Sequence, residues 1–307
     1  MTPELSVIVP TYKRTASLQK LLEILLTQQD VDLEIIVVDQ NTEDYFNEDM
    51  KALLKRVKWI KQENPNASGA RNTGFLSAVS NFVLFIDDDL VPEHDFCRKG
   101  LDVFLKYSTV GCFVPLVYND EGELAAEQSA RAKFISSLPE DKRIFSITDT
   151  MSAAVFFRRA YFFQSGGFDV FLFEFAKTAE DQEFFLRMLS KGMKLWVVPF
   201  VKVYHDENNP GGCDLRTTDY WITREKCMRA WALRYRTKTA DGKIKTTDFI
   251  RLFRSCVLNM EVLRSSPKYI ARQFSLMKKT MRGSLEFFET RKMVYSAKIE
   301  KGFLEQV

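Results

Sequence analysis

Three consecutive aspartates, Asp87, Asp88 and Asp89, follow the apolar segment Phe82–Ile86. The plainest interpretation is a solvated turn in which one carboxylate caps the next helix, because aspartate is a common N-cap residue. A cap needs only one carboxylate, however, and three adjacent ones repel each other. Hard oxygen ligands suit Mg²⁺ or Mn²⁺, and Mg²⁺ usually binds one or two carboxylates together with phosphate oxygens and water. The residues therefore favour a site for a divalent cation and a diphosphate.

The elements that position these carboxylates alternate in type along the first third of the chain. The segments Leu5–Val9, Leu33–Asp39 and Phe82–Ile86 are typical of strands covered on both faces. Leucines recur at helical spacing from Leu18, and Ser68 is the expected N-cap of a later helix. This alternation predicts an α/β fold with a mostly parallel, doubly wound sheet. Ligands bind beyond the carboxyl ends of the strands in such sheets, and the polar segments PTYKR, DQNTED, NPNASGARN and DDDLVPEH all follow predicted strands.

The rest of the chain is less regular and carries an uneven charge. We expect SGGFDVFLFEF to be a loop, AEDQEFFLRMLSKG a helix, LWVVP and VKVYH two strands, and the chain from about residue 215 mainly helical. Residues 215–307 contain 21 Lys and Arg against 9 Asp and Glu, whereas residues 1–214 contain 23 against 32. We therefore predict one domain over residues 1–214 and a basic, mainly helical C-terminal extension over residues 215–307, whose charge favours an anionic partner.

Composition excludes several classes of protein. Of the 307 residues, 46% are hydrophobic and 28% charged, which is typical of a folded globular chain and not of a disordered one. No run approaches the roughly 20 apolar residues of a transmembrane helix, and the start MTPELSVIVP lacks the pattern of a signal peptide. The five cysteines are scattered, which favours reduced thiols over disulfides or zinc ligands. A cytoplasmic location is therefore expected.

The order of several segments adds a resemblance to a known family. LSVIVPTYKR, VVDQNTED, SGARNTG and FIDDDLVP are followed by GGFD and AEDQEFFLR, over about residues 5–205. In this order and spacing they resemble the GT-A glycosyltransferases of family 2. The resemblance implies a GT-A domain over residues 1–214 that transfers a sugar, with inversion, from a nucleotide diphosphate to a polysaccharide or lipid-linked glycan. The aspartates would then hold Mn²⁺ or Mg²⁺, on which the donor diphosphate rests.

The resemblance also assigns the donor site. Asp39 matches the acid that hydrogen-bonds the nucleotide base, but DQN stands where the family pattern is DDGS, so the base stays open. A UDP- or dTDP-sugar is the expected donor. Asp87 is assigned to the ribose or the metal shell, and Asp89 to the metal itself. The other donor-binding residues implied by the resemblance are Pro10, Thr11, Tyr12, Arg14, Arg71, Asn72 and Asp88.

A second acidic pair, Glu180 and Asp181, opens a predicted helix. Helix N-termini favour acids in any case, so the pair alone leaves a purely structural role open. By resemblance, Asp181 is the general base that takes the proton of an acceptor hydroxyl as this oxygen attacks the anomeric carbon opposite the nucleotide. Gly167, Asp169 and Glu180 are placed on the acceptor side. His205 ends a predicted strand where some family members bind metal or diphosphate, and its imidazole suits Mn²⁺ better than Mg²⁺.

The C-terminal extension contains an apolar stripe surrounded by basic residues. Two interpretations stay open. The stripe could pack on the catalytic body or on a second subunit of a homo-oligomer, or it could lie on an anionic inner membrane face within reach of a lipid-linked acceptor. Its apolar positions are Ile270, Phe274, Met277, Met281, Leu285 and Phe288, and its basic ones are Arg272, Lys278, Lys279, Arg282, Arg291 and Lys292.

Other functions compete with sugar transfer. A nucleotidyltransferase also combines a Rossmann-like sheet with acidic metal ligands, but it more often has a glycine-rich first loop, whereas PTYKRT has no glycine. A non-catalytic nucleotide-sugar-binding protein is a further alternative, against which the presence of Asp89 and Asp181 speaks. Nucleic acid is not an expected partner, because the aromatic residues of the extension form no recognisable binding module.

Overall fold

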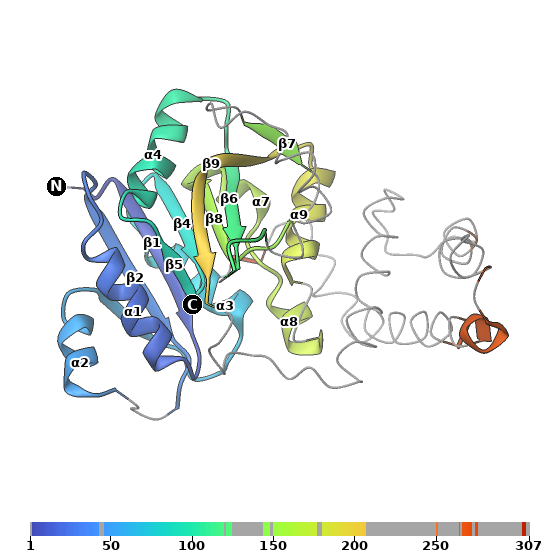
Figure 1. Ribbon diagram of the computed structural model, residues 1–307, viewed down its shortest axis with the longest axis horizontal. Helices are drawn as coiled ribbons and strands as arrows, with labels where there is room; N and C mark the ends of the chain where they lie inside the picture. The colour runs from blue at the N-terminus through green and yellow to red at the C-terminus, as the bar shows by residue number, and fades with distance from the viewer. Residues whose placement is uncertain are drawn as a thin grey trace.

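The computed structural model describes residues 2–42, 46–119, 121–124, 144–147, 150–176 and 180–206, together with 250, 264, 266–271, 274–275 and 303–304. Within these residues, a mixed β-sheet is covered by helices on both faces (Figure 1). The strands are β1 (Leu5–Thr11), β2 (Leu33–Asp39), β3 (Lys58–Lys61), β4 (Phe82–Ile86), β5 (Leu90–Pro92), β6 (Cys112–Tyr118), β7 (Phe145–Ile147), β8 (Ala154–Arg158) and β9 (Leu195–His205). The helices are α1 (Thr15–Leu25), α2 (Glu48–Leu54), α3 (Ala67–Ser77), α4 (Phe96–Lys106), α7 (Arg159–Ser165), α8 (Val170–Ala176) and α9 (Glu180–Ser190).

The sheet joins a parallel half to a mixed half. Its order is β3-β2-β1-β4-β8-β6-β9-β5, and β7 pairs with β9. The pairs among β3, β2, β1 and β4 are parallel, as is β6 with β9, while β8 is antiparallel to both β4 and β6. The predicted α/β class is confirmed. Because β2 and β4 lie on opposite sides of β1, the carboxyl ends of these strands form the switch point where ligands bind in open α/β sheets.

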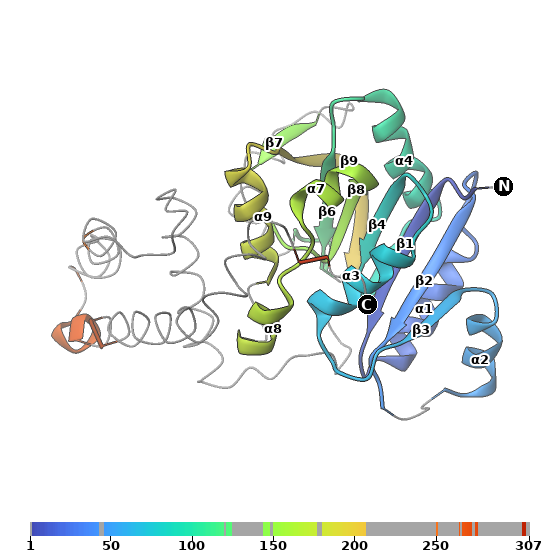
Figure 2. The same ribbon diagram turned by 180° about the vertical axis from the view of Figure 1, so that it is seen from behind.

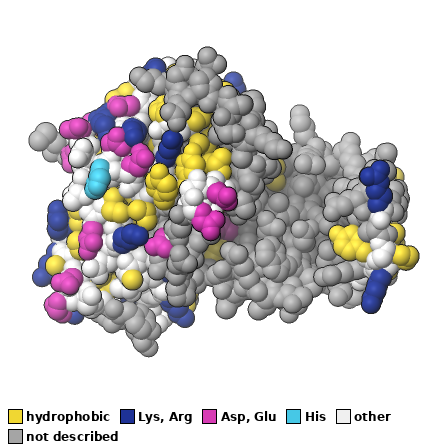
Figure 3. Space-filling view, in the orientation of Figure 1, with side chains coloured by type: hydrophobic (Ala, Val, Ile, Leu, Met, Phe, Trp, Pro, Cys, Tyr) yellow, Lys and Arg dark blue, Asp and Glu magenta, His cyan; other side chains and the backbone are white. Residues whose placement is uncertain are grey.

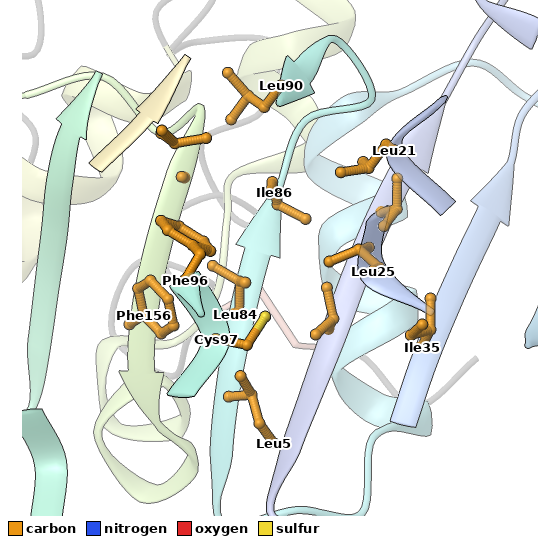
Figure 4. Packing of buried hydrophobic residues seen from close by; sticks show 14 of the residues in the cluster. Leu5, Leu21, Leu25, Ile35, Leu84, Ile86, Leu90, Phe96, Cys97 and Phe156 are labelled. Carbon is orange, nitrogen blue, oxygen red and sulfur yellow. The ribbon is translucent and has the colours of Figure 1, made fainter. Parts of the chain in front are cut away.

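Two apolar layers hold the helices to the sheet. On one face, Leu21 of α1 and Phe96 of α4 belong to the same buried cluster as Leu84 of β4 (Figure 4). On the other face, which Figure 2 shows from behind, Phe184 of α9 shares a cluster with Phe85 of β4. Successive β4 residues thus serve opposite layers, as the alternation of side chains along a strand requires. Each fully buried side chain of this size contributes about 1.5–3 kcal/mol to folding.

The N-cap of α3 lies two residues earlier than the sequence suggested. Its N-cap is Asn66, whose side-chain oxygen accepts a hydrogen bond from the Gly69 N–H at 2.9 Å. Ser68, the expected cap, is a fully buried residue inside the helix. Asparagine caps a helix about as well as serine, so the local sequence alone did not separate the two positions.

Two segments of the second half also differ from expectation. The residues after GGFD, expected as a loop, form α8, because Asp169 accepts hydrogen bonds from the Phe171 and Leu172 N–H groups at 2.9 Å and thereby starts a helix. The two late strands are one strand, β9, whose pairing with β6 shifts register opposite Pro115 and Leu116.

Most of the predicted extension lies outside the described residues, so its helical content and the domain boundary at residue 214 stay predictions. In the described part of the apolar stripe and beside it, Phe274 is 47% and Tyr269 38% exposed. Phe303, by contrast, is buried and contacts the first domain. Among the residues that the structure describes, no helix is both long and apolar enough to cross a bilayer.

Surface charges of both signs are interspersed over the described part of the face shown in Figure 3. At the surface of the described residues, Lys99 pairs with Glu93 and with Asp95, each at 2.9 Å, and Lys20 pairs with Asp206 at 3.3 Å. Exposed pairs of this kind typically contribute about 0–1 kcal/mol. The charges that bear on function are therefore the buried ones at the strand ends.

Candidate active site

The carboxyl ends of β1, β2 and β3 bring Asp39 into contact with Asn41 and Lys61. Thr11 is in register with Asp39, and Asp39 with Lys61. The fully buried carboxylate of Asp39 accepts hydrogen bonds from the Asn41 N–H at 2.9 Å, from Asn41 Nδ2 at 2.7 Å and from Lys61 Nζ at 2.8 Å. A buried charge without such donors would be costly, so Asn41 and Lys61 stabilise Asp39, the residue predicted to hydrogen-bond the nucleotide base.

The first loop reaches the triple aspartate through two side chains. Thr11 Oγ1 donates to Asp88 Oδ2 at 2.7 Å, and the Arg14 guanidinium pairs with Asp88 Oδ1 at 3.3 Å and with Asp89 Oδ2. Burial alone would lower the pKa of Arg14, but the charges of Asp89 and Asp88 outweigh it and raise that pKa. Burial, together with the charge of Asp89, raises the pKa of Asp88 to about 7. The positive charge at this cluster is thus too small to balance its carboxylates, as the sequence suggested.

The two other predicted residues of the first loop lie close by. Pro10 is buried at the end of β1, in register with Val38 of β2. Tyr12 is partly buried, and Lys13 Nζ lies 5.0 Å from the centre of its ring. Tyr12 therefore directly follows the end of β1, next to Thr11, which is in register with Asp39.

Asp89 and His205 meet because β5 pairs with β9. Leu90 is in register with His205, and the Asp206 N–H donates to the Asp89 carbonyl at 2.9 Å. His205 Nε2 lies 3.3 Å from Asp89 Oδ2. Burial would raise the pKa of Asp89, but the hydrogen bond from His205 and the charge of Arg14 lower it below its usual value. The structure therefore brings together the two residues that the sequence proposed as metal ligands.

Four buried polar atoms at these strand ends have no hydrogen-bond partner within the described residues: Arg14 Nε, Arg71 Nε, Arg71 Nη1 and Asp89 Oδ1. Buried polar atoms are paired in the great majority of cases, so a group of unpaired ones indicates a missing ligand. The three N–H donors suit phosphate oxygens, and the carboxylate oxygen suits a cation. Within the described residues, no three His, Cys, Asp or Glu side chains are grouped closely enough to hold a metal by themselves. Asp89 and His205 thus fit a cation that takes its remaining ligands from phosphate and water.

Arg71 links Asp87, predicted to lie on the donor side, with Glu180, predicted to lie on the acceptor side. The cap at Asn66 starts α3 so that Arg71 is buried one turn later, with Nη2 2.7 Å from Asp87 Oδ1. Its Nη1 lies 3.6 Å from Glu180 Oε1, an ion pair just beyond hydrogen-bond range. Burial would lower the pKa of Arg71, but the charges of Asp87 and Glu180 raise it. Arg71, which the sequence predicted to bind the donor, therefore also stabilises the start of α9 through its ion pair with Glu180.

Asn72, the next residue, supports the GGFD loop. Its side chain accepts from the Phe168 N–H and donates to the Phe168 carbonyl, both at 2.9 Å. Gly167 has a φ of 75°, in the left-handed region that favours glycine. Asp169 is fully buried and its Oδ1 starts α8, so it shapes the turn that the sequence analysis placed on the acceptor side.

Asp181 lies in the first turn of α9, beside Glu180. Its Oδ1 accepts a hydrogen bond from the Gln182 N–H at 2.7 Å. Burial, followed by the nearby charge of Glu180, raises the pKa of Asp181 to about 7. A carboxylate with a pKa near the working pH is suited to accept a proton. Glu180 is held by Arg71, so Asp181 is the better placed of the two for this task.

Sequence reasoning missed a buried ion pair behind the loop. Glu183 and Arg187 on α9 pair at 2.7 Å, and Arg187 also donates to the carbonyl oxygens of Gly167, at 2.5 Å, and of Ser165. The separation of four residues is the signal that could have found this pair. Lys61 was missed as well, because only the parallel pairing of β2 with β3 places it beside Asp39.

The sequence is similar to those of known glycosyltransferases. Over 107 residues the chain is 36% identical to glycosyltransferase GlyA of Streptococcus pneumoniae, a match that covers 34% of this chain and 15% of that protein. Over 137 residues it is 39% identical to the GalNAc(5)-diNAcBac-PP-undecaprenol beta-1,3-glucosyltransferase of Campylobacter jejuni, covering 42% of this chain and 43% of that protein. The chain thus spans less than half the length of these two relatives.

The fold has a solved counterpart in the mannosyltransferase PcManGT from Pyrobaculum calidifontis, in complex with GDP-Man and Mn²⁺. The TM-score is 0.55 at 17% identity, over 96% of this chain and 81% of that chain, which shows a shared GT-A fold. Residues 6–165, more than half of the 307, match the sequence model described as glycosyl transferase family 2. This match decides against the nucleotidyltransferase alternative. The chain belongs to glycosyltransferase family 2.

Proposed function

We propose that the chain is an inverting, divalent-metal-dependent glycosyltransferase that moves a sugar from a nucleotide diphosphate sugar to a polysaccharide or lipid-linked glycan. The observation that carries this proposal is the group of buried atoms of Arg14, Arg71 and Asp89 near the strand ends that have no hydrogen-bond partner among the described residues. Three N–H donors and one carboxylate oxygen, close to a switch point of the sheet, match a diphosphate with its cation. Membership of the family supplies the class of reaction.

Asp89 and His205 would hold the cation. The unpaired Asp89 Oδ1 offers an oxygen ligand, and His205 Nε2 lies 3.3 Å from the other oxygen of the same carboxylate. When bound, Mn²⁺ or Mg²⁺ would supply positive charge against the charge that grows on the departing diphosphate. PcManGT, which shares the fold, is described in complex with Mn²⁺, and this supports the same use of a divalent metal here.

The transfer itself needs a base and a way to stabilise the leaving group. Asp181 accepts the proton from an acceptor hydroxyl while that oxygen bonds to the anomeric carbon of the donor sugar. The bond from this carbon to the diphosphate oxygen breaks on the opposite side, so the configuration inverts. The N–H groups of Arg14 and Arg71 donate to the departing diphosphate, whose charge they stabilise more strongly in this buried site than in water.

The nucleotide base of the donor and the kind of acceptor are proposed from the chemistry of the site and from the relatives. Asp39 and Asn41 belong to the DQN segment, which stands where the family pattern is DDGS, and Lys61 also pairs with Asp39, so GDP belongs in the same test as UDP and dTDP. The name of the C. jejuni relative describes an undecaprenol-linked acceptor, which supports a lipid-linked glycan. Contact of the basic extension with the inner membrane face would suit such an acceptor.

A donor screen tests the proposal. UDP-, dTDP- and GDP-sugars are incubated with Mn²⁺ and with either soluble oligosaccharides or undecaprenyl diphosphate glycans, and release of the nucleoside diphosphate is followed. We expect release with one donor, its loss in EDTA, and its loss in Asp181→Asn. Absence of release from every donor with both acceptor types, or equal release in EDTA, would contradict the proposal.

A further inference from the structure

The GGFD turn contacts a segment from a distant part of the sequence. Phe303 is 2% exposed, and its N–H donates to the carbonyl oxygen of Gly166. The Phe303 carbonyl accepts from Asn72 Nδ2 at 3.5 Å, and its ring centre lies 5.0 Å from the guanidinium carbon of Arg187. The short dark-red segment in Figure 2 marks its place. Phe303 therefore contacts α3, α9 and the turn after α7 at once.

Leu304 occupies the space that a side chain at Gly167 would need. Gly166 and Gly167 both lie in the left-handed region, with φ of 90° and 75°, which glycine adopts without strain. A Cβ atom on Gly167 would come within 2.7 Å of Leu304 Cγ and 2.9 Å of Asn72 Oδ1. The second glycine of GGFD is thus required by the turn and by the close approach of Leu304. The motif is more than a flexible connection.

The groups that contact residues 303–304 also fix the acceptor side of the site. Asn72 holds both polar backbone groups of Phe168 at 2.9 Å, and Arg187 donates to the Gly167 carbonyl at 2.5 Å. The guanidinium carbon of Arg71, next to Asn72, lies 5.3 Å from the centre of the Phe168 ring. A displacement of residues 303–304 would therefore disturb the GGFD turn through its contacts with α3 and α9. Through α9 it would also disturb the first turn of that helix, which carries Asp181.

We infer that Phe303 and Leu304 are positioning residues for sugar transfer, which hold the Gly166–Asp169 turn between α3 and α9. The catalytic consequence rests on the proposed function, whereas the effect on the turn does not. Misplacing reacting groups by about 1 Å can lower a rate about 100-fold. Of the residues proposed to bind the nucleotide, Asn72 on α3 is the one that the described contacts join to residues 303–304, whereas Asp39 ends β2, Asp87 follows β4, and Arg71 is held by its ion pair with Asp87. Loss of the contact therefore lowers kcat for transfer and leaves nucleotide affinity in place.

The test compares Phe303→Ala with Phe163→Ala in the full-length protein. Phe163 lies on the neighbouring α7 and is 64% exposed, so it is a matched control for the same change of side chain. Hydrogen exchange of peptides covering residues 166–172 should become faster in Phe303→Ala and stay unchanged in the control. Transfer kcat should fall about 10-fold or more, while calorimetric affinity for UDP, dTDP or GDP with Mn²⁺ stays within about twofold. Phe303→Leu, which keeps an apolar side chain, should recover most of the lost kcat.

Two results would overturn the inference. One is wild-type exchange of residues 166–172 in Phe303→Ala, and the other is faster exchange with unchanged transfer kcat. If Phe303→Ala does not fold, Leu304→Ala removes only the contact at Gly167 and is subject to the same two measurements. Failure of the proposed function would give a different result. The wild-type protein would then release no nucleoside diphosphate, while the difference in hydrogen exchange between Phe303→Ala and the wild type persisted.

Discussion

Asp181→Asn is expected to remove most of the transfer activity and yet stabilise the protein above pH 7. Burial, and then the charge of Glu180, raises the pKa of Asp181 from 3.8 to about 7. A pKa shift of about 3 units corresponds to about 4 kcal/mol, since each unit is worth about 1.4 kcal/mol. Asp181 is partly exposed, and screening by solvent reduces this upper bound to about 1–3 kcal/mol.

The direction follows from where the proton is bound. Because the pKa is higher in the folded state than in the unfolded chain, the contribution of Asp181 to stability is fully present below about pH 4 and is lost as the pH rises through about 7. Asparagine stays neutral at every pH, so the variant escapes this loss. Its side-chain oxygen can still accept the hydrogen bond from the Gln182 N–H, which measures 2.7 Å in the wild-type protein. The gain in stability should therefore grow from about pH 4 to pH 7 and then level off.

Thermal unfolding at several pH values and a transfer assay measure the two effects. At pH 8.5 the melting temperature of Asp181→Asn should rise by roughly 2–10 °C, while transfer falls about 10²- to 10⁴-fold and nucleotide affinity is kept. Asp49→Asn is the control, because Asp49 is an exposed acid in the first turn of α2 and should lose only a few tenths of a kcal/mol. A lower melting temperature at pH 8.5 together with near wild-type transfer would refute the reasoning. Asp181 would then be a helix-start acid, and Glu180 would become the candidate base.

Three further outcomes are expected. In Asp89→Ala, or in EDTA, calorimetry should show that affinity for the nucleoside diphosphate falls by on the order of several kcal/mol, and unchanged affinity would contradict the metal site. Glu183→Ala should lower the free energy of unfolding by about 3–5 kcal/mol in urea titrations because it leaves a buried arginine unpaired, whereas the exposed-pair control Glu48→Ala should stay within about 0.5 kcal/mol. If the apolar stripe of the extension and the basic residues around it bind membranes, the protein should sediment with anionic liposomes and be released at high salt. The double variant Lys278→Glu with Lys279→Glu should then not bind. Absence of wild-type sedimentation would favour packing.

The sequence by itself determined where the polar residues of the proposed donor site lie relative to the strands. Apolar runs that end in polar loops predicted parallel strands with their ligands at the carboxyl ends, and the structure places Thr11, Asp39 and Asp88 there. This succeeds because strand patterning and the position of strand ends are local properties of the chain. The same holds for Asp181 in the first turn of α9, where an apolar helical face follows two acids.

Only the tertiary structure decided which distant side chains complete these motifs. Lys61 reaches Asp39 because β3 pairs with β2, and His205 reaches Asp89 because β5 pairs antiparallel with β9. Gly166 and Gly167, just before Asp169, permitted either a loop or a helix in the sequence, and the structure shows that the carboxylate of Asp169 starts α8. Phe303 shows the limit most clearly: its burial depends on contacts with residues more than 100 positions away. Pairings of this kind depend on how elements are arranged in space, and no periodicity along a single chain records that arrangement.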